Sequence, residues 1–430
     1  MRRGILVIGL GLLGCPEADP PSQRLPAEEQ APARPPAPSP RLPARPESVD
    51  PQASTSPVNA FGLDYYAHAS KKPGNLVFSP ASVFVAFAMI YAGARGETAE
   101  EIKATFHFGT RQEVAGVATM LADNSAAAAG PTTLGLPASE GIELVVGNRM
   151  FVSNNLKLKD AYLALAGPVM TAPLKTLDFV DDPDGSRVKI NDQVELATRS
   201  RVKDLLPEGS VNRETALVVT NTIYLNGKWA HPFNKARTGD MDFRSPTGST
   251  QVPMMRGKAR VPYFADDNLA VVDLPYADGR LSMMLVLPAD DDGLADVEDS
   301  LTPTLLDGWA KKLSATKVTL LVPIFRVEPT GPSSLRSTLI AMGMPRVFDS
   351  RAEFDIANEP LFIANAFHQA FIAVNEEGTE AAAAAGVIMQ RKKKAKKVPL
   401  FFADHPFLFF VRDRETGTVL FMGRVTKPEW

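Results

Sequence analysis

Helical patterns lie mainly in the first half of this chain and strand-like patterns mainly in the second, and this order constrains the fold more than any other feature. Helical periodicity occurs at 59–69, 82–93, 159–167, 184–200 and 301–313. Strand-like runs occur at 142–152, 216–225, 270–274, 281–287, 317–323, 371–374, 406–411 and 419–425. Because helices lie mainly in the first half and strands mainly in the second, we predict an α+β fold with large, mostly antiparallel sheets.

The amino-terminal segment differs in composition from the rest of the 430 residues. Of the 42 residues from 16 to 57, 13 are proline, and almost none can contribute to a core. We therefore predict a disordered, semi-rigid spacer over 15–57. The other 373 residues (430 − 57) are enough for one large domain or two modest ones.

Composition also excludes several classes of site. A net charge of −3 argues against a protein that coats nucleic acid, because phosphate binding needs a basic surface. A single cysteine excludes intrachain disulfides and thiolate zinc fingers, and five histidines leave little material for a metal site. We expect no metal, no cofactor and no nucleic-acid partner.

The first fifteen residues have the features of a secretory signal. Two arginines precede an apolar run, Ile5–Leu13, which is too short for a permanent membrane span. Leu12–Cys15 resembles the lipobox of bacterial lipoproteins, so we expect a signal peptide at 1–14 and a lipidated Cys15. The alternative is an ordinary signal peptide with an incidental cysteine. The expected location is a bacterial envelope or surface, with a lipid anchor, or outside the cell.

Several motifs, in a fixed order, are similar to those of the serpin family along 58–428. They are Asn75–Ser82 (NLVFSPAS), Asn148–Phe151, Ile190–Asn191 with Val194 and Thr198, Thr220–Phe233 (TNTIYLNGKWAHPF), Val252–Met255, Asp273–Tyr276 and Leu420–Pro428. The resemblance implies a serpin domain over 58–430, with helices packed on three β-sheets and an exposed reactive-centre loop. Gln193 departs from the family pattern, which usually has tryptophan there.

The resemblance also implies roles for residues around the main sheet. Ser79, Ser82, Asn191 and His368 would form a polar shutter cluster beneath it, and Trp229 would lie at the breach where the loop enters. Each has a simpler interpretation. Ser79 suits a helix N-cap, His368 a buried core histidine, and Trp229 a core residue.

The segment 376–406 carries the function that the resemblance implies. It reads EEGTEAAAAAGVIMQRKKKAKKVPLFFADHP. By itself, Ala381–Ala385 favours a surface helix that ends in a solvated basic run. The resemblance implies instead a loop that, once cut, inserts as a strand into an existing sheet. Its hinge would comprise Glu376, Gly378, Thr379, Glu380, Ala381, Ala382, Ala383, Ala384 and Ala385.

The hinge composition suits a strand that enters a crowded sheet. Small side chains displace few packed neighbours, and alanine loses almost no side-chain entropy on burial. Because side chains alternate, Thr379 and every second residue to Ala385 would face the core, with Glu380 outward. Gly378 allows the backbone to swing, and no proline interrupts 376–398.

Counting along the loop locates the bond that a protease would cut. In inhibitory serpins the residue before that bond lies fourteen after the hinge glycine, which gives Lys392–Lys393, with Arg391 as the alternative. The resemblance therefore implies a monomeric serine-type endopeptidase inhibitor, itself no enzyme, that traps a trypsin-like protease covalently. The alternative is a non-inhibitory binding protein of the same fold that holds a polyanion on Arg391–Lys397.

Overall fold

The computed structural model describes residues 57–111, 113–114, 142–166, 174–329, 331, 333–379 and 398–430. The expected signal peptide, Cys15 and the proline-rich segment before Pro57 lie outside these residues. Within the described ranges, no helix has both the length and the apolar character needed to cross a bilayer.

Three of the described helices, α2, α6 and α8, begin at a proline that follows a capping side chain. Ser79, Asp182 and Thr302 each accept a hydrogen bond from a backbone N–H in the first turn, and proline follows each of them. Proline suits this position because its missing N–H would have no partner inside the helix. The helices are α1 (Pro57–Ala69), α2 (Pro80–Gly93), α3 (Gly96–Phe106), α5 (Asp160–Ala166), α6 (Pro183–Ala197), α7 (Leu294–Ser300), α8 (Pro303–Lys312) and α9 (Arg336–Ala341), with 3-10 turns η4 (Lys235–Arg237) and η5 (Arg346–Phe348).

One sheet contains nine described strands in the order β1-β17-β16-β8-β7-β6-β9-β15, with β5 paired to β6. Its strands are β1 (Leu76–Phe78), β5 (Gly239–Ser245), β6 (Gly248–Ala265), β7 (Leu269–Pro275), β8 (Leu281–Pro288), β9 (Ser314–Pro323), β15 (Leu400–Phe402), β16 (Phe407–Asp413) and β17 (Val419–Val425). The long strand β6 pairs with β5, then β9, then β7. Because β6 is shared, the described strands hydrogen-bond into two sheets, whereas the family resemblance implied three.

The second sheet contains eight described strands and carries the candidate site. They are β2 (Ile142–Ser153), β3 (Lys175–Leu177), β4 (Leu217–Lys228), β10 (Phe325–Val327), β11 (Ser333–Ser334), β12 (Phe367–Ala370), β13 (Ile372–Val374) and β14 (Gly378–Thr379). The path runs β10-β13-β14-β4-β12-β11, and β2 pairs with the other edge of β4. In the two sheets, the pairs β12·β4, β2·β3 and β15·β9 are parallel and all other described pairs are antiparallel, as predicted.

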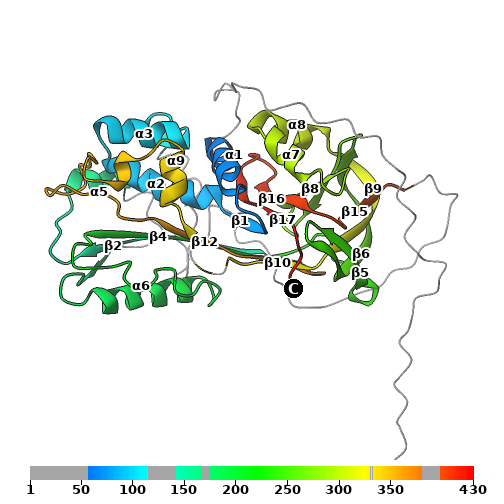
Figure 1. The fold of residues 1–430 in the computed structure, drawn as a ribbon, viewed down its shortest axis with the longest axis horizontal. Helices are drawn as coiled ribbons and strands as arrows, with labels where there is room; N and C mark the ends of the chain where they lie inside the picture. The colour runs from blue at the N-terminus through cyan, green and yellow to red at the C-terminus, as the bar shows by residue number, and fades with distance from the viewer. Residues whose placement is uncertain are drawn as a thin grey trace, which may run out of the picture. The chain divides into compact units, whose positions relative to one another are not determined.

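Helices cover both faces of the second sheet. Figure 1 shows α2 on one face of β4 and α6 on the other. Helix α2 belongs to the main core and is buried over nearly its whole length. A smaller apolar cluster, which includes Phe151, Phe179 and Ile190, lies on the α6 side. The sheet therefore separates two apolar layers.

Predicted and observed elements agree where the apolar pattern is strong. The eight predicted strand-like runs match β2, β4, β7, β8, β9, β13, β16 and β17, and the five helical patterns match α1, α2, α5, α6 and α8. The helix predicted at 184–200 ends earlier, at Ala197. Arg199 and Ser200 have φ angles of 54° and 60°, which an α-helix does not accommodate.

Candidate functional site

In the second sheet, β4 and β12 are hydrogen-bonded along only part of their length. These parallel strands pair at three positions, His368–Asn221, Gln369–Thr222 and Ala370–Ile223. Beyond Ala370 the chain leaves β4, and β13 pairs with β10 and β14 instead. The space that opens beside the end of β4 is where β14 lies.

Strand β14 consists of Gly378 and Thr379, two residues of the predicted insertion hinge. Gly378 pairs with Lys228 and Thr379 with Gly227, both on β4, and Thr379 also pairs with Val374 on β13. The Thr379 side chain is fully buried, and its Oγ1 lies 2.8 Å from the Tyr276 hydroxyl. Burial raises the pKa of Tyr276 well above its usual value, so this hydrogen bond joins two neutral groups.

Gly378 is required by a close approach of two backbones. A Cβ atom at this position would lie 1.9 Å from the Gly227 carbonyl oxygen and 2.7 Å from the Lys228 Cα. These are backbone atoms that cannot rotate away. Its φ of 157° lies at the edge of the region that favours glycine. Any other residue would push β14 off β4.

Trp229 fixes the chain that leads into β14. Its indole Nε1 donates to the Asn375 carbonyl at 3.0 Å, and its backbone N–H donates to the Glu377 carbonyl at 2.8 Å. The ring stacks on Tyr276 at 4.7 Å between centroids. Trp229 is therefore both a core residue and a partner of the hinge, as the two interpretations of the sequence allow.

Two glutamates add side-chain contacts at the same place. Glu376 accepts a hydrogen bond from the Thr238 hydroxyl at 2.7 Å, and Glu377 forms an ion pair with Lys235 at 2.6 Å. The Glu377 carboxylate raises the pKa of Lys235. Lys235 is well exposed, so this pair contributes little stability by itself. Tyr276, Asn375 and Glu377 were not predicted as site residues, although Tyr276 ends one of the quoted motifs.

Ser79 and His368 meet beneath the sheet. Ser79 caps α2 by accepting a hydrogen bond from the Ser82 N–H at 3.1 Å. The Ser79 backbone N–H donates to His368 Nε2, also at 3.1 Å. Because an N–H can only donate, Nε2 must be unprotonated in this contact. Complete burial lowers the pKa of His368 to about 4, so the imidazole is neutral near pH 7.

Asn191 does not belong to this cluster, so its assignment to the shutter was wrong. It lies on α6, which covers the opposite face of the sheet from α2 (Figure 1). Its side chain donates to the Leu206 carbonyl and accepts from the Leu206 N–H, at 3.0 and 2.8 Å. The asparagine beside His368 in the strand register is Asn221. A motif in sequence does not reveal which face of a sheet its residues will reach.

Gln193 connects α6 to the sheet by polar contacts. Its Oε1 accepts hydrogen bonds from Arg149 of β2 at 3.0 Å and from Lys175 of β3 at 2.5 Å. The departure from tryptophan therefore exchanges apolar packing for charge-assisted hydrogen bonds.

The remaining predicted loop residues are not described. Glu380, Ala381, Ala382, Ala383, Ala384, Ala385, Arg391, Lys392 and Lys393 all lie in 380–397, outside the described residues. The described chain resumes at Val398 and continues into β15, which pairs with β9 of the other sheet. Within the described ranges, no group of three or more acidic, histidine or cysteine side chains could hold a metal ion.

The comparisons with known proteins all point to one protein family. The family model described as Serpin (serine protease inhibitor) matches residues 56–428. An uncharacterized serpin-like protein of Thermococcus kodakarensis is 34% identical over 86% of this chain and 85% of its own length. Antithrombin-III of Mus musculus is also 34% identical, over 86% of this chain and 80% of its own. The solved structure of Serpin48 from Tenebrio molitor covers 89% of this chain and 100% of its own, with a TM-score of 0.74 and 27% identity.

Proposed function

The chain belongs to the serpin family, and from this premise we propose that it irreversibly inhibits serine proteases of trypsin-like specificity by acyl-enzyme trapping and loop insertion. Family membership supports protease inhibition in general terms, by proteins that are not enzymes. The trypsin-like specificity and the trapping mechanism go beyond family membership, and they are what we propose.

The observation that carries the proposal is the pairing of Gly378 and Thr379 with β4. These residues already occupy the first two positions of a strand antiparallel to β4. If the register continues, each further residue pairs with the preceding residue of β4, so residue 379 + 10 = 389 reaches 227 − 10 = 217, where β4 begins. Ten residues after Thr379 therefore match the length of strand available.

Insertion along this path replaces one short set of strand pairs with two longer sets. It separates the three β12·β4 pairs, and the new strand hydrogen-bonds to β4 on one edge and to β12 and β13 on the other. Parallel pairs are slightly less stable than the antiparallel pairs that replace them. The uncut protein would thus be kinetically trapped, because an intact loop is tethered at both ends.

The loop sequence suits this path. Thr379 faces the main core, so Ala381, Ala383 and Ala385 would follow on that face, opposite Leu225, Ile223 and Asn221 of β4. Methyl side chains would enter with the least displacement of packed neighbours.

The covalent chemistry would be that of the target protease. Its serine attacks the Lys392 carbonyl, the Lys392–Lys393 bond breaks, and an ester joins the protease to Lys392. Insertion then carries the protease along the sheet and distorts its active site before water hydrolyses the ester. A Lys or Arg before the scissile bond suits the acidic specificity pocket of trypsin-like enzymes, and basic residues surround Lys392 on both sides.

The test is incubation with trypsin followed by denaturing electrophoresis. We expect a complex that survives SDS. Thr379→Arg, which would bury a charge against Tyr276, should convert the protein into a substrate that is cut without forming a complex. Thr247→Arg, in the exposed turn between β5 and β6, is the matched control and should leave the complex unchanged. Cleavage of the wild type without any complex would reject the proposal.

The second candidate is polyanion binding by the basic run Arg391–Lys397, in which six of seven residues are cationic. Such a run attracts phosphate or sulfate groups with strong salt dependence. Salt-sensitive retention on heparin, together with no protease complex, would favour this function over inhibition. Retention together with a complex would assign both.

We propose further that Cys15 is lipidated and holds the domain at a bacterial envelope through the proline-rich spacer. The lipobox-like sequence before Cys15 supports this anchor. The wild type should partition into the detergent phase of a Triton X-114 extract, and Cys15→Ser should move it into the aqueous phase. Equal partitioning of both proteins would reject the anchor.

A further inference from the structure

Two cationic side chains converge on one neutral oxygen atom beneath α6. Arg149 of β2 and Lys175 of β3 both donate hydrogen bonds to Oε1 of Gln193, at 3.0 and 2.5 Å. Their two nitrogen atoms therefore lie at most about 5.5 Å apart (3.0 + 2.5 Å). Among the residues that the structure describes, neither cation forms an ion pair with a carboxylate. The positive charge at this contact therefore has no opposite charge beside it in the described part of the chain.

An amide oxygen is a weak substitute for a carboxylate at such a contact. It carries no net charge, so it does not offset the repulsion between two cations that lie close together. Other buried arginines of this chain pair with carboxylates, Arg412 with Asp273 and Arg424 with Glu298. Burial lowers the pKa of Arg149, because desolvation disfavours the charged guanidinium. An anion at this contact would supply the missing negative charge.

The strand register places a further hydroxyl group beside Arg149. Phe151 and Val218 pair across β2 and β4, and both belong with Ile190 of α6 to one apolar cluster. Because side chains alternate along a strand, the next pair on this face is Arg149 with Thr220. Thr220 is only 1% exposed, and within the described ranges its Oγ1 has no hydrogen-bond partner. The layer between α6 and the sheet thus changes from apolar to polar at this pair.

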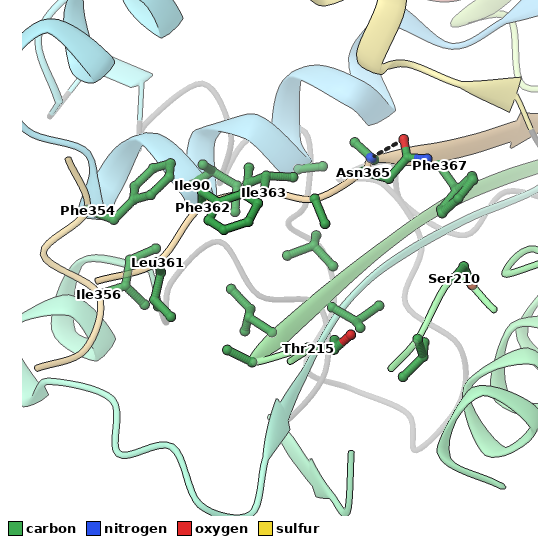
Figure 2. Close-up of a pocket in the computed structure, with 18 of the residues that line it drawn as sticks. Ile90, Ser210, Thr215, Phe354, Ile356, Leu361, Phe362, Ile363, Asn365 and Phe367 are labelled. Atoms are coloured by element: carbon green, nitrogen blue, oxygen red, sulfur yellow. Dashed lines mark hydrogen bonds between the residues drawn. The ribbon is translucent and has the colours of Figure 1, made fainter. Parts of the chain in front are cut away.

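The cavity beside the start of β4 has a different character. Figure 2 shows Ile90, Leu361 and Ile363 around this space, which has a volume of about 220 Å³ and is also lined by Val218. Glu214 is the one charged residue among the described residues that line it. An anion would find no cation in this cavity, whereas the contact beneath α6 offers two.

We propose that Arg149, Lys175 and Gln193 bind a small tetrahedral oxyanion with two negative charges, of the phosphate or sulfate class. Two of its oxygen atoms would accept the hydrogen bonds that Gln193 Oε1 now accepts, and its charge would offset both cations. The Gln193 amide also carries an NH2 group, so after a rotation it would donate to the ion. The Thr220 hydroxyl lies beside Arg149 as a further donor. Lys175 is exposed, so a free ion can enter from solvent.

This site depends on the glutamine and is separate from the reactive loop. The serpin pattern usually has tryptophan in place of Gln193, and an indole N–H only donates, so it could not accept from two cations. None of the site residues lies in 376–397, so the inference goes beyond protease inhibition. A bound ion would join α6 to both β2 and β3 by charge-assisted hydrogen bonds. It would stabilise the folded protein in proportion to its occupancy.

The test is calorimetric titration of inorganic phosphate into the intact protein at pH 7.5 and constant ionic strength, together with thermal unfolding. We expect saturable binding to the wild type and a rise in melting temperature of about 1–4 °C at ten times the dissociation constant. Lys175→Met should weaken binding at least about tenfold. Lys317→Met, at an exposed position on β9 of the other sheet, is the matched control and should bind as the wild type does.

Gln193→Glu gives a second, independent result. A glutamate has almost the same shape and places its own carboxylate between the two cations. This variant should therefore unfold at a higher temperature than the wild type in phosphate-free buffer, and it should no longer bind phosphate. Without an added anion, a lower melting temperature than that of the wild type would show that no negative charge is missing here, and would overturn the proposal.

The remaining outcomes concern where the ion binds and which ion it is. Absence of saturable binding to the wild type, or phosphate binding by Lys175→Met with unchanged affinity, would overturn the site; in the second case the basic run Arg391–Lys397 would be the phosphate-binding segment. Acetate, with a single charge, should bind at least about tenfold more weakly than phosphate, and equal affinity would reject a dianion. Heparin retention should be the same in Lys175→Met as in the wild type, and its loss would assign the site to a sulfated polymer instead of a free ion.

Discussion

Acidification should destabilise the native protein through His368. The imidazole is fully buried, and its pKa falls from 6.5 to about 4 because burial disfavours the charged ring. Between these two values the unfolded chain binds more protons than the folded one, so stability falls as the pH decreases. For these two pKa values the loss is about 2 kcal/mol at pH 5 and about 3 kcal/mol at pH 4.

The structural cause gives a specific variant. Protonation of Nε2 removes the acceptor of the Ser79 N–H, and Ser79 begins α2 beneath the sheet. A glutamine side chain supplies a neutral oxygen acceptor and cannot be protonated in this range. His368→Gln should therefore fold and lose the part of the pH dependence that belongs to His368.

The assay is guanidinium unfolding at pH 7.5 and pH 5, monitored by tryptophan fluorescence. The loss in unfolding free energy between the two pH values should be about 2 kcal/mol larger in the wild type than in His368→Gln. His231→Gln, at an exposed position, should behave as the wild type. If His368→Gln keeps the full pH dependence, the neutral buried imidazole is not its source.

Three further substitutions test individual positions of the fold, one of them in the hinge. Gly378→Ala should force β14 off β4 and lower the free energy of unfolding of the intact form by about 1–3 kcal/mol. It should also change the fluorescence of Trp229, because the Trp229 indole donates a hydrogen bond to the chain before β14. An unchanged fluorescence spectrum would contradict this prediction. Asn191→Ala removes two buried hydrogen bonds to Leu206 and should cost about 2–4 kcal/mol in urea unfolding; a cost below about 0.5 kcal/mol contradicts the contact. Gly308→Ala in α8, where a Cβ meets nothing within 4 Å, should stabilise by about 0.5–1 kcal/mol in the same assay, and a loss would contradict the open space.

Strands with continuous apolar runs were predictable, and strands with mixed composition were not. Strand β8 reads LSMMLVLP and is buried throughout, so its pattern indicates a strand without further help. Strand β6 contains Gly257 and the prolines Pro253 and Pro262, which argue against a strand. Its pairing with β5 and β9 along most of its length outweighs this local preference.

The hinge was expected from the family resemblance, whereas its partners depended on tertiary structure. Composition alone favours a surface helix at Ala381–Ala385 and does not indicate a hinge. Tyr276 follows β7 of the other sheet, pairs with Trp229 at the end of β4 and contacts Thr379 from there. The misassignment of Asn191 has the same origin, since α6 and α2 lie on opposite faces of one sheet.

The central claim is that the intact fold is metastable and that cutting the loop after Lys392 lets 380–389 complete the sheet. The most direct measurement is thermal unfolding of the purified protein before and after limited cleavage by trypsin, with the two fragments kept together. The account predicts that the cleaved form unfolds at a clearly higher temperature than the intact form. Equal temperatures, or a lower one after cleavage, would contradict it.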